Sequence, residues 1–254
     1  VSTLLGMINK GLYNIKLTDV TVADLQILTS PTATSNLLFN DKAIESIFIT
    51  DSVAAIQSNL NLLNNAGSRI KSIDLNSILE GGIQVIPPLT IETTDFINRQ
   101  KVLDKIVGGY KVDLEKATAK QALSLASNSH VQSIDLEDSS SNISTYWNQL
   151  IDINTQLDDI KISGARVAIT ATQYELGLEA NIQDKILAAA FPITFAIKNA
   201  SIDQALNLVA DDAASNFIGT LEIKDTGANI INNLDNLKEL LAGPPSITTS
   251  LFQV

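Results

Sequence analysis

The sequence predicts an α/β repeat solenoid, in which short parallel strands alternate with helices that pack along one side. Three observations lead to this prediction. A strand-and-helix pattern occurs three times, its copies are separated by equal intervals, and the apolar period within each copy changes from 2 to about 3.6 residues. The copies are IESIFITDSVAAIQSNLNLL from Ile44, VQSIDLEDSSSNISTYWNQL from Val131 and IGTLEIKDTGANIINNLDNL from Ile218. The interval from Asp51 to Asp138, and again from Asp138 to Asp225, is 87 residues.

The strand of this pattern is predicted from residues that alternate in hydrophobicity, which places every second side chain on one face. These residues are Ile47 and Ile49, Ile134 and Leu136, and Leu221 and Ile223. The polar pair after each strand is typical of a helix start, because a short side-chain oxygen accepts from the exposed amides of the first turn. Apolar residues then follow along one helix face, at Ile56, Leu60 and Leu63, at Ile143, Trp147 and Leu150, and at Ile230, Leu234 and Leu237.

Trp147 occupies the position held by Leu60 and Leu234 in the other copies. This register predicts that Trp147 lies in the core and that its neighbour Tyr146 faces solvent. The alternative is that the two aromatic residues form an exposed platform on which a sugar ring could stack.

Two further strand-and-helix patterns recur between these copies. The first reads YNIKLTDVTVADLQIL from Tyr13, YKVDLEKATAKQALSL from Tyr110 and ITFAIKNASIDQALNL from Ile193. The second reads LTIETTDFINRQKVLDKI from Leu89 and VAITATQYELGLEANIQDKI from Val167, and its helix is expected to begin after Phe96 or Tyr174. Short strands are expected at IKSIDL from Ile70 and at DIKISG from Asp159.

These units predict about three β-α coils per 87 residues. No linker separates independent domains, so we expect a single repeat array over residues 1–254, with approximate periods 1–69, 70–157 and 158–254. Two segments vary between periods and are expected to be loops, namely ILEGGIQVIPP around Gly81 and NLLFNDKA near Phe39.

The composition excludes several classes of function. Acidic residues outnumber basic ones by 28 to 17, which gives a net charge of −11 and argues against nucleic acid or an anionic membrane surface as a partner. Without cysteine, neither disulfides nor thiolate sites can form. No apolar run approaches the length of about 18 residues that predicts a membrane span, so membrane insertion is not expected. The chain begins with neither an initiator Met nor a leader, which favours a mature form or a piece of a longer protein.

Four predicted strands have the spacing LxxLxL, which resembles the strand segment of leucine-rich repeats. They are Ile44-Ile47-Ile49, Ile70-Ile73-Leu75, Val131-Ile134-Leu136 and Ile218-Leu221-Ile223. Where those repeats place an Asn, three residues after the last apolar position, this chain has Ser52, Ser139 or Thr226. The resemblance therefore implies similar geometry and not membership of that family.

A second resemblance covers most of the chain. The segments SIFITDSVAAIQSNLNLL, KDTGANIINNLDNL and VAITATQY resemble tandem repeats of large secreted bacterial surface proteins, which include S-layer-like, adhesin-like and calcium-binding RTX-type exoproteins. This resemblance implies a structural or adhesive protein, secreted or on the bacterial cell surface. Its partners would be neighbouring repeats of the same chain or lattice. The nonapeptide calcium repeat of such proteins is not present in the sequence.

The candidate site residues are Asp51, Asp138 and Asp225, which end the three equivalent strands. Helix capping explains them, and the alternative is that they stack as a column of carboxylates that binds calcium. Calcium is the one possible cofactor that the sequence suggests. The single histidine, His130, precedes a strand where the other copies have Ala43 or Phe217, so a catalytic triad is not expected.

The leading hypothesis is therefore a spacer, lattice or adhesion element with no enzymatic activity. The alternative is a module that binds glycan or a surface protein through the variable loops near Gly81 and Phe39. Only a cleft that holds two or more converging acids would favour an enzyme.

Overall fold

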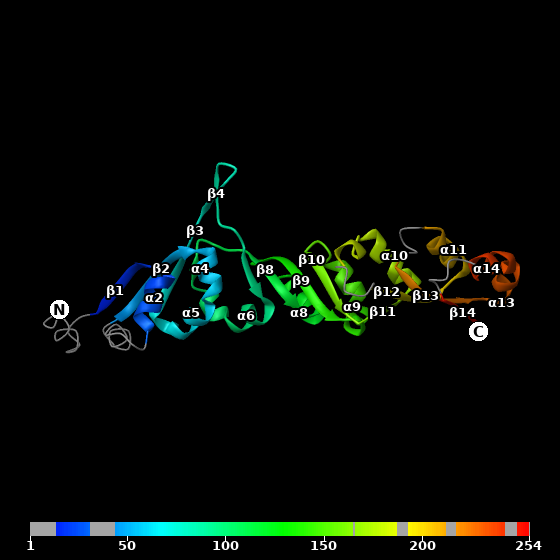
Figure 1. Cartoon of the computed structure of the whole chain (residues 1–254), viewed down its shortest axis with the longest axis horizontal. Coiled ribbons are helices and arrows are strands. Elements are labelled where there is room, and N and C mark those ends of the chain that lie inside the picture. The colour runs from blue at the N-terminus through cyan, green and yellow to red at the C-terminus, as the bar shows by residue number, and fades with distance from the viewer. Residues whose placement is uncertain are drawn as a thin grey trace. The chain divides into compact units, whose positions relative to one another are not determined.

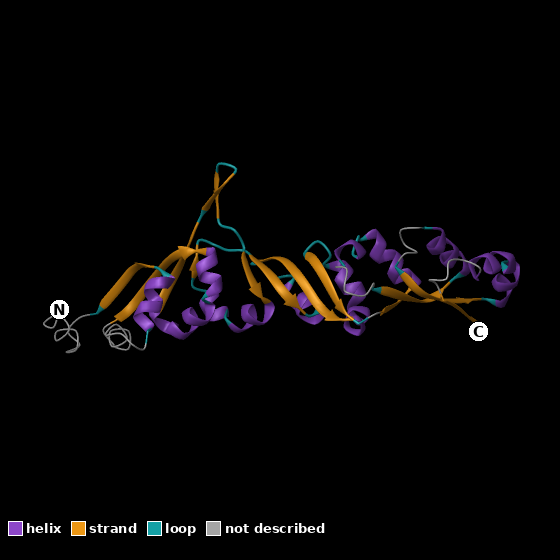
Figure 2. Ribbon diagram, viewed as in Figure 1, coloured by secondary structure: helices purple, strands orange, loops and turns teal. Residues whose placement is uncertain are grey.

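The computed structural model describes residues 14–30, 44–164, 166–186, 193–211, 217–241 and 248–253. The chain divides into two compact units, one formed by residues 1–114 and 129–132 and the other by residues 115–128 and 133–254. Each unit contains strands and helices that alternate along the chain (Figures 1 and 2).

The first half of the chain holds β1 (Ile15–Val20), α2 (Val22–Thr29), β2 (Ile44–Ser52), α4 (Val53–Ser58), α5 (Leu60–Ala66), β3 (Ile70–Asn76), β4 (Ile78–Glu80), β5 (Ile83–Val85), β6 (Leu89–Glu92), α6 (Thr93–Asn98), α7 (Gln100–Leu103), β7 (Ile106–Val107), β8 (Val112–Ala117) and α8 (Ala119–Leu125). The second half holds β9 (Val131–Ser139), α9 (Ser140–Asp152), β10 (Leu157–Ser163), β11 (Arg166–Thr170), α10 (Ala171–Glu179), β12 (Thr194–Ala200), α11 (Ile202–Ala210), β13 (Ile218–Asp225), α13 (Gly227–Asn232), α14 (Leu234–Leu241) and β14 (Thr248–Gln253). Short 3₁₀ turns follow α5 and α10, at Gly67–Arg69 and Gln183–Lys185.

The described strands form three four-stranded sheets, with orders β1-β2-β3-β7, β10-β9-β8-β6 and β11-β12-β13-β14. The pairs within the first and third sheets are parallel, as is the pair of β9 with β10. Three adjacent strands of the second sheet, β6, β8 and β9, have the same succession of sequence patterns as β11, β12 and β13 of the third. The predicted α/β class with parallel strands is therefore confirmed.

One face of each long strand is buried, as the period of 2 predicts. In β2 the side chains of Ile44, Ile47 and Ile49 are buried, and the residues between them are half-buried or exposed. The register aligns these faces across strands, because Ile49 of β2 lies opposite Ile73 of β3. The helices pack nearby, with α9 against β11, α10 against β12 and α11 against β13.

The helix stripes are buried in the first two copies of the main pattern and only partly in the third. Leu60 and Trp147 are 5% and 0% exposed, whereas Leu234 is 49% exposed. Asn59 interrupts the first helix and Asn233 the third, while α9 continues for 13 residues without a break.

The core position of Trp147 is confirmed. Its indole Nε1 donates a hydrogen bond to the Gln173 carbonyl oxygen at 2.7 Å, and its ring meets that of Phe195 edge to face. Tyr146 is half-buried and so differs from the expected solvent position, because α9 is covered over more than one narrow stripe.

The expected helix start after Phe96 or Tyr174 is wrong. Helix α6 begins at Thr93 and helix α10 at Ala171, so each aromatic ring lies in the first turn and points into the core. The Thr-rich stretch provides the helix start itself. Thr170 caps α10, because its hydroxyl oxygen accepts a hydrogen bond from the Gln173 backbone amide. The Gln173 side-chain oxygen in turn accepts one from the Thr170 backbone amide.

The segment around Gly81, expected as a loop, is a β-hairpin. Strands β4 and β5 pair antiparallel with each other, and Gly81 and Gly82 turn the chain with φ values of 57° and 87°. Two successive positive φ values are those of a type I′ turn, which glycine adopts without strain. The hairpin extends from the first unit (Figure 2). The side chains of Ile78, Leu79 and Ile83 are exposed on it. The loop near Phe39 lies outside the described residues.

Candidate functional site

The three aspartates at intervals of 87 residues make the same two backbone contacts. One oxygen of each carboxylate accepts from the amide of the next residue, at 2.7 Å in all three cases. The other oxygen accepts from the amide of the first residue of a different helix. These pairs are Asp51 with Val22 of α2 at 2.8 Å, Asp138 with Ala119 of α8 at 2.9 Å and Asp225 with Ile202 of α11 at 3.1 Å.

The strand period explains why the aspartate reaches that helix. In β9, Ile134, Leu136 and Asp138 share one parity, so the carboxylate lies on the buried face at the end of the strand. The neighbouring strand β8 leads directly into α8, whose first amide has no partner within its helix. Asp138 therefore satisfies an amide of the helix that follows the neighbouring strand, while Ser139 caps its own helix.

The aspartates therefore cap a helix as predicted, but it is the preceding helix and not the one that follows them in the chain. The residues that cap the helices after these strands are Ser52, Ser139 and Thr226, and the aspartates join each strand to the preceding helix. Hydrogen bonds from the Ile202 amide, the Asn229 side chain and the Thr226 amide lower the pKa of Asp225 below its ordinary value.

A residue with positive φ lies three positions before the first residue of each helix that receives such an aspartate. Asp19, Lys116 and Asn199 have φ values of 54°, 55° and 55°. At the first and third positions the strand register shifts here, which is the geometry of a β-bulge. The positive φ and the aspartate contact therefore occur together three times, and a register shift accompanies two of them.

The three aspartates lie in three different sheets, since β2, β9 and β13 belong to separate sheets. Within the described ranges, no three or more His, Asp or Glu side chains are arranged so that they could hold a metal ion together. Calcium binding remains a prediction. At Asp138, the ion would compete for the carboxylate with the amides of Ser139 and Ala119 and with the side chain of Asn142.

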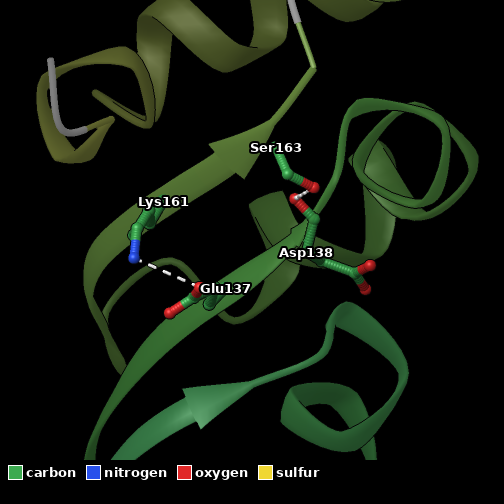
Figure 3. A network of polar contacts seen from close by, with 4 residues as sticks. All are labelled: Glu137, Asp138, Lys161 and Ser163. Atoms are coloured by element: carbon green, nitrogen blue, oxygen red, sulfur yellow. Dashed lines mark hydrogen bonds and ion pairs between the residues drawn. The ribbon is translucent and has the colours of Figure 1, made fainter. Parts of the chain in front are cut away.

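The consecutive acids of β9 point to opposite sides of the sheet. Figure 3 shows Glu137 directed toward Lys161, with Asp138 directed away from this pair. The Lys161 Nζ lies 3.1 Å from a carboxylate oxygen of Glu137, and the Ser163 hydroxyl donates to the Asp138 carbonyl. The carboxylates of Asp138 and Glu137 therefore do not contribute to the same charged site.

A small acidic hollow lies on the Glu137 side of the second unit. It has a volume of about 190 Å³, and its lining includes Glu115, Asp135, Glu137 and Asp159, with Lys161 beside them. Burial raises the pKa of Asp135, and the nearby charges of Asp159, Asp158 and Glu115 raise it further. The sequence suggested no such group, although the shared parity of Asp135 and Glu137 on one strand was a usable signal.

A larger hollow of about 550 Å³ adjoins the hairpin in the first unit. The rings of Tyr110 and His130 stack beside it with centroids 4.1 Å apart and an interplanar angle of 11°. Gln84, Ile86 and Lys111 complete this face. His130 Nδ1 lies 3.1 Å from the Tyr110 carbonyl oxygen, and burial raises the Tyr110 pKa to about 12. The single histidine thus contributes to a surface beside the hairpin.

Comparisons with known proteins give no further guide to function. A scan of protein-family models found no match to this chain, and searches of curated proteins and of solved structures found none. Among the described helices, none combines the length and the apolar character needed to cross a membrane.

Proposed function

We propose that this chain is a structural or adhesive segment of a large exported bacterial surface protein, in which β-α units stack into a solenoid and act as spacer, lattice or adhesion element. The carboxylate contact that recurs at Asp51, Asp138 and Asp225 carries this proposal. In each case the aspartate at the end of one strand satisfies the start of the preceding helix. Such nearest-neighbour dependence is what a stacked array requires.

Contacts between helices and the strands that follow them are a second observation that supports stacking. The Gln57 side chain of α4 accepts from the Thr90 amide of β6 at 3.0 Å, and the Ser144 hydroxyl of α9 accepts from the Ala168 amide of β11 at 2.9 Å. Gln57 and Ser144 lie 87 residues apart, so equivalent helices contact the following strand in the same way. The matching position in α13 is Ile231, which is 68% exposed.

Surface localisation is tested by labelling intact cells of the source organism with antibodies against this chain. The proposal predicts labelling before permeabilisation and loss of adhesion or of lattice order when residues 44–241 are removed from the gene. Detection of the antigen only after the cells are opened would contradict it. An unrelated cytosolic protein serves as the permeability control.

The second candidate is a module that binds glycan or a surface protein. The hollow beside Tyr110 and His130 favours it, because stacked rings, an amide and a lysine border an open surface next to the exposed hairpin. A glycan array tests this candidate with the native chain and with His130→Ala. Phe217→Ala, at the matching position of the third copy, is the control. Binding that is absent from the native chain, or that survives His130→Ala, would exclude this surface as the glycan site.

A further inference from the structure

Lysines converge on a hollow of the first unit whose lining shares no residue with the two hollows described above. The hollow has a volume of about 720 Å³ and is formed where the end of α5 and the start of β3 lie beside α7. Its lining includes Lys71, Lys101 and Lys105, together with Asn64, Ser68 and Asp104.

Two of the lysines are held in place by backbone carbonyl groups. Lys105 Nζ donates to the Gly67 carbonyl, and Lys71 Nζ donates to the Ser68 carbonyl at 3.1 Å. A lysine ammonium has three donors, so each retains capacity for a ligand after one such contact. Lys101 is exposed at the same hollow.

The charge of this hollow is opposite to that of the chain. The protein has a net charge of −11 with only 17 basic residues, yet three lysines and one aspartate line this single hollow. Burial lowers the pKa of Lys105, and the neighbouring charge of Lys71 lowers it further. A bound anion would favour the ammonium form of Lys105 and would offset the repulsion between the two lysines.

We propose that this hollow binds an oxyanion group, a carboxylate, sulfate or phosphate, carried by a ligand of sugar size. The lysines would hold the anion, and Asn64 and Ser68 supply an amide and a hydroxyl for neighbouring hydroxyl groups. The volume lies within the range of about 300–1,000 Å³ that is typical of small-molecule sites. This inference goes beyond the proposed structural role and does not depend on it.

Isothermal titration of the full chain at constant ionic strength tests the proposal. The probes are glucuronate, glucose 6-sulfate and glucose 6-phosphate, with glucose as the uncharged control and inorganic sulfate and phosphate as the free anions. The variants are Lys101→Gln and the double variant Lys71→Gln with Lys101→Gln. Lys120→Gln, on the exposed face of α8, is the matched control. Lys105 is kept, because its ammonium holds the Gly67 carbonyl.

The native chain is expected to bind at least one charged sugar, and to bind it at least about tenfold more tightly than glucose. Lys101→Gln is expected to weaken that binding, and the double variant to weaken it by about tenfold or more, with Lys120→Gln unchanged. An equal loss in Lys120→Gln would overturn the proposal. Equal binding of glucose, or binding of inorganic anions with none of the charged sugars, would also overturn it. Circular dichroism checks that each variant is folded, and Lys101→Gln, an exposed change, decides the test if the double variant is not.

Discussion

Asp138, the eighth residue of β9, accepts a hydrogen bond at 2.9 Å from the amide of Ala119, the first residue of α8. A carboxylate that accepts from amides at a helix start is favoured both by the unpaired amides and by the helix dipole. The contact also fixes the strand against the preceding helix. It is therefore the first place at which the proposed stacking can be tested.

Asp138→Asn is expected to destabilise the protein, because an amide group offers only one accepting oxygen to the Ala119 and Ser139 amides. The loss should be about 1–2 kcal/mol in the free energy of unfolding, measured with urea at pH 7. Glu137→Gln is the matched control, since its exposed pair with Lys161 should contribute less than about 1 kcal/mol. Equal losses in the two variants would show that the helix contact has no special weight.

Equivalent leucines are expected to differ in their contribution to stability. Leu60→Ala should cost about 2–5 kcal/mol, because the buried side chain leaves a cavity between packed elements. Leu234→Ala, at the matching position of the third copy and 49% exposed, should cost less than about 1 kcal/mol. Urea unfolding of both variants measures the difference. Comparable costs would show that the face of α14 is covered in solution.

The positive φ of Lys116 predicts a stabilising substitution. Lys116→Asn should raise the free energy of unfolding by about 0.5–1 kcal/mol, because asparagine tolerates the left-handed region better than lysine. The third copy already has Asn199 at this position. Lys198→Asn, next to Asn199 in β12, is the control and should give no gain. A loss of stability in Lys116→Asn would mean that the lysine side chain contributes more than the backbone costs.

The pKa of Asp135 predicts how stability depends on pH. A carboxyl whose pKa is raised on folding destabilises the native state above that pKa, and the penalty vanishes below the ordinary value of 3.8. Asp135→Asn should therefore raise the melting temperature at pH 7, and the gain should shrink as the pH falls toward 4. Glu222→Gln, at the matching position of β13, is the control. A gain that does not change with pH would exclude this electrostatic cause.

Calcium is tested by melting the protein with calcium and with chelator. The calcium prediction requires a rise in the melting temperature with calcium that is lost in Asp138→Asn. Superimposable curves would discard it, and the amide hydrogen bonds that Asp51, Asp138 and Asp225 already accept would then account for these carboxylates.

Local periodicity predicted the elements of this fold well. The alternation at Ile47 and Ile49 and the helix spacing at Ile143 and Trp147 depend only on near neighbours, and the buried faces agree with both. The equal intervals also led directly to the three aspartates. The helix starts at Thr93 and Ala171 were missed, because a Thr-rich stretch suits a strand as well as a cap.

The candidate sites depend on contacts that the sequence alone does not reveal. Lys71 and Lys105 are 34 residues apart, and they converge only because the 3₁₀ turn after α5 lies beside the residues that follow α7. The partner of Asp138 was likewise hidden, because it belongs to the helix after the neighbouring strand. The repeat period gave no sign that the strands would divide into three separate four-stranded sheets.

The hairpin at Gly81 and Gly82 offers a site at which a label can be inserted. Its two strands pair with each other and with no other described strand, so its tip can accept a short tag without breaking a sheet. A fluorophore attached there would report on the first unit while leaving its core untouched. The same insertion point would allow the proposed surface location to be followed in living cells.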